Sequence, residues 1–175
     1  MKKLIALIMV VAMAASLVAC GNKAAVEKAP LEGTMEENTM KVMEIAPVEF
    51  MGGTIPVDLT DTSEDGKWAV NYFTGLNDAS KITDVAVYES MMGSQAFSLV
   101  MVRTAEGADP KAVAEEMKSG IDPRKWICVG ADEIMAAGYG DTVMFIMLDS
   151  QLGLSAQSYV DAFAQVAGGE LDFTI

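Results

Sequence analysis

The stretch Thr142-Val143-Met144-Phe145-Ile146-Met147-Leu148 decides the fold of this chain of 175 residues. After Thr142, polar and apolar side chains do not alternate, and an unbroken apolar run of this length is typical of a strand that is buried on both faces. Gly140-Asp141 directly before the run forms a glycine-containing tight turn, and Glu133 to Tyr139 supplies a partner strand. We therefore expect a hairpin whose second strand is central in a sheet.

A first hairpin is predicted upstream. Asp84 to Glu89 and Gln95 to Arg103 are rich in β-forming residues, and the connection between them, Ser90 to Ser94, contains glycine. Helices are predicted from their caps and stops. They cover about 64–74, capped by Thr62 or Ser63 and ended by Gly75; Asp109-Pro110 to about Lys118; and about 156–167, capped by Ser155.

A short helix followed by the order ββαββα indicates the α+β class. We expect a four-stranded, mainly antiparallel sheet with helices mostly on one face. Trp68 and Trp126 are expected in the core, and Cys128 is expected to be a small buried hydrophobic residue in the irregular segment 121–131.

The first 20 residues have the layout of a lipoprotein export signal. Lys2 and Lys3 precede an apolar run from Leu4 to Ala15, and Leu17-Val18-Ala19-Cys20 resembles a lipobox. The run is well short of the roughly 20 residues that span a bilayer. We expect cleavage between Ala19 and Cys20, acylation of Cys20, and anchoring to the extracytoplasmic face of the cell membrane. The alternative is an ordinary secreted protein.

These patterns divide the chain into four parts. Residues 1–19 are the signal peptide, and 20–37 are the acylated Cys20 with a flexible tether, because that stretch is polar and has no helical or strand period. Residues 38–61 are an extended segment of uncertain status, with a short edge strand as one option. Residues 62–175 are a single globular domain.

The stretch from Tyr72 to Gly168 has a recognisable layout. It comprises the strand Val85-Ala86-Val87-Tyr88 followed by Met91-Met92, the strand Leu99-Val100-Met101-Val102, the Asp109 to Lys118 helix, and a glycine before the last long strand. In this it resembles the domain of unknown function 4358 family, found in small lipoproteins of Gram-positive bacteria. The resemblance implies an envelope location and a fold, and no mechanism.

Charge and composition exclude several classes of function. Without Lys2 and Lys3, 10 of the 12 basic residues remain against 25 acidic ones, a net charge of −15 that disfavours nucleic acids and anionic lipid headgroups. The chain has no histidine, which removes Ser-His-Asp and Cys-His catalysis, and no serine stands in a Ser-x-x-Lys motif. A zinc site with several thiolates cannot be completed by one free cysteine. Paired carboxylates stay open but have no distinguishing pattern.

Two motifs imitate metal sites. Asp61-x-Ser63-x-Asp65-Gly66 matches the first half of an EF-hand loop, but Tyr72 stands where the twelfth-position glutamate is needed, so we interpret the motif as a capped helix start. The pairs Met40-x-x-Met43 and Met144-x-x-Met147 have a Cu(I)-like spacing. On a strand, Met144 and Met147 point to opposite faces, so core packing is the favoured interpretation.

Met91-Met92 at the predicted hairpin tip is the candidate interaction surface, because exposed methionines form adaptable contacts. The alternative is a partly buried hairpin tip. The leading hypothesis is a non-enzymatic, lipid-anchored extracytoplasmic domain, without cofactor or metal, that binds a protein or peptide of the cell envelope. The alternative is a small-ligand or cation-binding accessory lipoprotein of a transporter. A hydrolase with two carboxylates is the third option.

Overall fold

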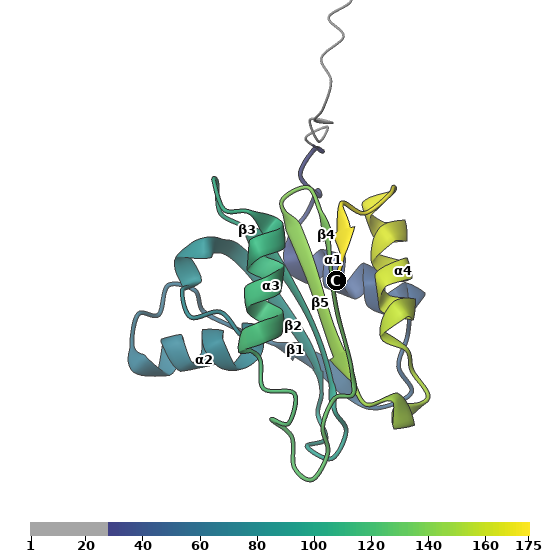
Figure 1. The fold of residues 1–175 in the computed structure, drawn as a ribbon. Coiled ribbons are helices and arrows are strands. Elements are labelled where there is room, and N and C mark those ends of the chain that lie inside the picture. Colours follow the sequence, from purple (N-terminus) through teal and green to yellow (C-terminus); the bar gives the residue numbers. More distant parts are fainter. Residues whose placement is uncertain (1–27) are drawn as a thin grey trace, which may run out of the picture.

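The computed structural model describes residues 28–175. Its six strands form one antiparallel sheet in the order β1-β2-β3-β5-β4-β6 (Figure 1). In chain order the elements are α1 (Met35–Ile45), β1 (Gly52–Ile55), α2 (Glu64–Thr74), η1 (Ala79–Lys81), β2 (Ile82–Ser90), β3 (Phe97–Thr104), α3 (Pro110–Gly120), β4 (Glu133–Tyr139), β5 (Thr142–Leu148), η2 (Ser150–Leu152), α4 (Ala156–Ala167) and β6 (Phe173–Thr174).

The α+β class and both predicted hairpins are confirmed, whereas the prediction of four strands is wrong. The hairpins are β2–β3 and β4–β5, and the two additional strands lie at the sheet edges. β1 has four residues, two of them glycine, and β6 has two residues. Strands this short cannot display an alternating pattern in the sequence.

Strand β5 is central and buried along its whole length, as its composition predicts. It pairs with β3 on one side and β4 on the other. Met144, Ile146 and Leu148 enter one core, while Val143, Phe145 and Met147 enter a second core on the opposite face. Met144 and Met147 therefore point to opposite faces, as expected for a strand.

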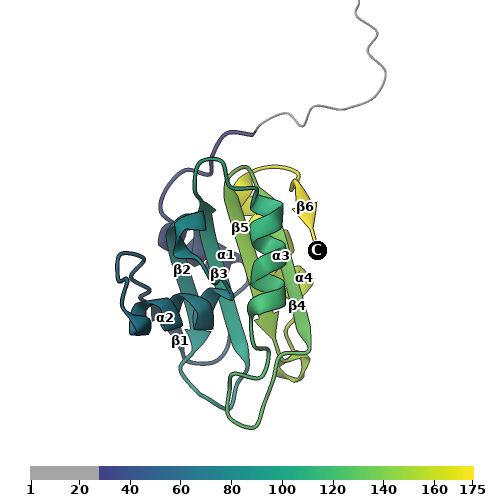
Figure 2. The same cartoon turned by 60° about the vertical axis from the view of Figure 1, so that its left-hand side comes forward.

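Helices cover both faces of the sheet, so the prediction of helices mostly on one face is wrong. α1 and α4 pack on the core that contains Ile146, and α2 and α3 pack on the core that contains Phe145 (Figures 1 and 2). Because β3 and β5 are apolar on both sides, each face of the sheet needs its own cover.

Helix α1 covers part of one face of the sheet, and it lies across the predicted tether (20–37) and the predicted extended segment (38–61). The prediction is wrong for residues 35–45, which are helical. The start of α1 is a capping box: Glu37 N–H donates to Thr34 Oγ1 (3.1 Å), and Thr34 N–H donates to Glu37 Oε2 (2.9 Å). Met35 and Val42 are completely buried against the sheet.

The three predicted helices are confirmed. In α2 the cap is Ser63, whose Oγ accepts from Gly66 N–H (3.2 Å), while Asp61 accepts from Ser63 N–H (2.9 Å). The EF-hand-like motif is therefore a capped helix start. Ser155 occupies the N-cap of α4 but makes no side-chain capping bond; Glu133 Oε2 accepts from Ala156 N–H instead (2.7 Å).

Two expected core residues are at the surface. Trp68 is exposed and stacks on Tyr72, with ring centroids 4.7 Å apart. Cys128 is exposed and has a positive φ of 63°. Trp126 is partly buried against the core that contains Phe145, as expected. The apolar run around Cys128 belongs to a loop, where apolar character does not fix the direction of each side chain.

A close approach between glycines joins α2 to α3. A Cβ at Gly120 would lie 2.0 Å from the carbonyl oxygen of Gly75, which ends α2 in the left-handed conformation (φ 76°). Gly120→Ala must therefore push the two helices apart, and we predict a loss of about 1–3 kcal/mol in the free energy of unfolding. Urea titration measures it.

Gly169→Ala is the matched control for this prediction. The nearest atom to its added Cβ is a Tyr139 ring carbon at 3.9 Å, and its φ is not positive. The control should stay within about 0.5 kcal/mol of the parent protein. Equal stabilities of the two alanine variants would contradict the role of the contact.

Candidate interaction surface

Met91 and Met92, the predicted interaction residues, lie in the connection between β2 and β3 and are 62% and 49% exposed. The connection is held by its own hydrogen bonds. Met92 N–H donates to Ser90 Oγ (3.1 Å), and Gln95 N–H donates to Met92 O (3.0 Å). The two methionines are therefore presented on an ordered turn.

Two further exposed apolar residues join them from distant parts of the chain. Met91 N–H donates to Met51 O (2.9 Å), and Ile127 N–H donates to Gly93 O (2.8 Å). Met51 is 73% and Ile127 72% exposed. We call Met51, Met91, Met92 and Ile127 the apolar tip. Sequence reasoning missed Met51 and Ile127, because only these backbone bonds between segments bring them beside the turn.

A buried ion pair holds the loop that carries Ile127 against the β2–β3 hairpin. Lys125 Nζ lies 2.6 Å from Glu89 Oε1, and both side chains are almost completely buried. The ammonium also lies 4.8–5.3 Å from the ring centroids of Tyr72, Phe73 and Trp126. Burial lowers the pKa of Lys125, and the Glu89 carboxylate opposes that shift.

The same region could suggest a serine nucleophile beside a lysine, since Ser98 pairs with Glu89 across the strands. Ser98 is completely buried, and its hydroxyl has no hydrogen-bond partner among the described residues. The Lys125 side chain is about equally inaccessible. A substrate therefore cannot reach either group, and the geometry is that of a structural support.

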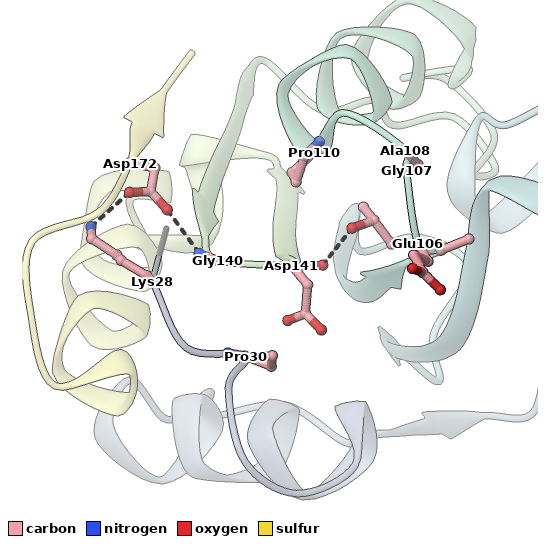
Figure 3. Close-up of a pocket in the computed structure, with 11 residues that line it drawn as sticks. Lys28, Pro30, Glu106, Gly107, Ala108, Pro110, Gly140, Asp141 and Asp172 are labelled. Carbon is pink, nitrogen blue, oxygen red and sulfur yellow. Dashed lines mark hydrogen bonds and ion pairs between the residues drawn. The ribbon is translucent and has the colours of Figure 1, made fainter. Parts of the chain in front are cut away.

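A cleft of about 710 Å³ lies at the other end of the sheet (Figure 3). Residues 28–30, the β3–α3 connection and the β4–β5 turn surround it. Two of its carboxylates already have partners. Asp172 lies 2.8 Å from Lys28 Nζ and accepts from Gly140 N–H (2.7 Å), and Asp141 accepts from Arg103 (2.8 Å). Glu106 at the rim is exposed.

These contacts give the cleft little capacity for a metal ion. In residues 28–175, no group of three or more histidine, cysteine, aspartate or glutamate side chains is placed to hold one. The cleft is of a size that accommodates a small molecule.

The β2–β3 connection, which carries Met91 and Met92, and the β4–β5 turn, which lines the cleft, lie at opposite ends of the sheet (Figures 1 and 2). The described chain enters at the cleft end, where Arg103 donates to Leu31 O (2.7 Å) and Gly33 O (2.8 Å). The tip lies where β3 begins. Eight residues of β3 separate the two ends by roughly 25 Å. Residues 28–33, expected as tether, are therefore packed on the domain.

Ala19 and Cys20, the predicted cleavage and lipidation residues, lie outside the described residues. Within residues 28–175, none of the helices has the length and apolar character required to cross a bilayer. Searches among protein-family models, curated proteins and solved structures found no match. The resemblance to the domain of unknown function 4358 family therefore stays a prediction.

The buried ion pair gives a stability prediction. Lys125→Met leaves the Glu89 carboxylate buried without a counter-charge, and we expect the free energy of unfolding to fall by about 3–5 kcal/mol. Urea titration of the variant and the parent protein measures the difference.

Two control variants show whether the unpaired buried charge causes the loss of stability. The double variant Glu89→Gln with Lys125→Met removes both charges and should recover part of the loss. Lys118→Met removes an exposed lysine of α3 and should change stability by less than about 0.5 kcal/mol. A loss below about 1 kcal/mol in Lys125→Met would show that the pair does not support the loop.

Proposed function

We propose that this protein is a lipid-anchored extracytoplasmic interaction domain, without enzymatic activity, that binds a protein of the cell envelope through its apolar tip. The observation that carries the proposal is the position of the tip. Four exposed apolar residues lie on three segments that backbone hydrogen bonds join at the β2–β3 connection, at the end of the sheet opposite to the chain entry (Figure 1). Exposed apolar groups gathered on a rigid support are characteristic of protein-binding sites.

Chain length supports an orientation toward the partner. Lys28 follows Cys20 by eight positions, and a chain of that length can span at most about 28 Å when fully extended. An acyl anchor on Cys20 therefore keeps the cleft end within about 28 Å of the membrane, and we propose that the domain stands with the tip away from it. The net charge of −15 opposes close contact between the domain and anionic headgroups.

The chemistry of the tip supports a protein partner in particular. Three of its four residues are methionines, whose flexible thioether side chains adapt to apolar surfaces of different shape. The backbone bonds at Met51, Met91 and Ile127 fix the position of the tip, so little backbone order is lost on binding.

The cleft favours a second candidate function, a small-ligand-binding accessory lipoprotein of a transporter. Its volume of about 710 Å³ lies within the range of small-molecule sites. Thermal-shift assays with Ca²⁺, Cu(I) and a metabolite panel distinguish the two. A raised melting temperature supports the second candidate, and an unchanged one supports the first.

The anchor is tested directly by Cys20→Ala. The variant cannot form the thioether, so we expect it to lose all labelling by a fatty-acid precursor in cells and to stay unprocessed or be released. Cys128→Ala, which removes the other cysteine, should keep full labelling. Undiminished labelling of Cys20→Ala would refute the proposed lipidation.

The tip is tested by replacing Met51, Met91, Met92 and Ile127 together with serine. We expect the lipidated variant to lose specific envelope proteins that the parent protein retains in a detergent pull-down, because the apolar contact area is removed. The control variant Ile45→Ser with Trp68→Ser removes two exposed apolar residues elsewhere on the surface. It should still retain the envelope proteins that the parent protein retains. Identical captured proteins for the tip variant and the parent would contradict the proposal.

A further inference from the structure

Strand β1 leaves one edge of the sheet open. It is the first strand in the sheet order and pairs only with β2. Met91 N–H donates to Met51 O, so Met51 and Met91 are opposite each other as a hydrogen-bonded residue pair. Because such pairs alternate in an antiparallel ladder, Gly53 and Ile55 face β2, and the backbone groups of Gly52 and Thr54 point away from it. They can pair with another strand.

Helix α1 packs over the neighbouring strands β2 and β3, and its residues line a groove with residues of β1 in two separate sections. Glu36, Met40, Met43 and Glu44 follow the spacing of one helix face. One section of the groove, of about 320 Å³, is lined by Met40, Met43, Glu44, Phe50, Met51 and Tyr88 among others. A second section of the same volume is lined by Glu36, Thr54, Ile55 and Pro56 with part of β2. We call the two sections the edge groove.

Gly52 allows the Tyr88 ring to pack directly against the edge strand. A Cβ at this position would lie 2.6 Å from the Tyr88 ring, so only glycine allows the ring to cover the strand here. Gly52 and Gly53 leave the edge backbone without side chains, which is the arrangement found where a second backbone approaches closely.

The edge groove combines an apolar floor with acidic ends. Met40 and Met51 are exposed, and Phe50 and Tyr88 are partly buried. Glu36 and Glu44 are exposed, and no basic residue lines either section. Glu36 and Glu44 are eight helical residues apart, a distance of about 12 Å along the helix. An extended peptide spans the same distance with roughly four residues.

We propose that the edge groove binds an extended cationic peptide segment, which adds to β1 as a seventh strand. Its backbone pairs with the outward groups of Gly52 and Thr54, and alternate apolar side chains contact Met40, Phe50 and Tyr88. Lysine or arginine residues flanking this apolar core pair with Glu36 and Glu44. Main-chain pairing supplies affinity in such complexes, and the side chains supply specificity. Of the tip residues, the edge groove includes only Met51.

The test uses a fluorescent peptide, Lys-Lys-Val-Thr-Val-Thr-Val-Lys-Lys, and the mature lipidated protein in a neutral detergent. We expect saturable binding by fluorescence anisotropy. Thr54→Pro removes one outward N–H and should weaken binding by about tenfold or more, while Thr54→Val keeps that N–H and should bind like the parent. Urea titration checks that both variants fold.

A charge reversal gives an independent measure. Glu44→Lys should weaken binding by about tenfold or more. Glu115→Lys, at an exposed position of α3, makes the same change in net charge and should leave binding unchanged. No saturable binding, or equal weakening by the two reversals, would overturn the proposal. Thr54→Pro leaves the apolar tip intact, so a failure here is distinguishable from a failure of envelope capture by the tip.

Discussion

The burial of β5 on both faces is the constraint on which the rest of the structure depends. Phe145 and Ile146 are neighbours in the chain but belong to different cores, so the sheet needs a covering layer on each side. α2 and α3 form one layer. The other needs α1 in addition to α4, which draws the segment after Thr34 into the fold. The chain consequently enters at one end of the sheet, and the opposite end is free for contacts.

Sequence patterns predicted the elements whose signals are local. Both hairpins and the helices α2, α3 and α4 follow from apolar runs, caps and turn residues that lie within each element. β6 could not be predicted, because two residues contain no period and its pairing with β4 depends on the tertiary fold. α1 was predictable in part, since the Thr34 and Glu37 capping box is visible in the sequence. The polar residues around it obscured the signal.

The candidate interaction surface likewise contains residues that local sequence predicts and residues that only the tertiary fold brings together. Met91 and Met92 could be found because a hairpin connection is local, whereas Met51 and Ile127 reach the apolar tip through bonds between distant segments. The Glu89–Lys125 pair was not predictable for the same reason, because 36 residues separate its members. Cys128 was expected in the core from its apolar neighbours. The loop conformation, with its positive φ, turns it to the surface.

The central claim is that the lipid anchor holds the cleft end near the membrane and the apolar tip away from it. Cys128 lies beside Ile127 of the tip and is the one free thiol expected once Cys20 is acylated. A fluorophore on Cys128 can be compared with one on Glu106→Cys, in a Cys128→Ser background, using lipidated protein in vesicles with a headgroup quencher. The account predicts strong quenching at 106 and weak quenching at 128. Equal quenching, or stronger quenching at 128, would contradict it.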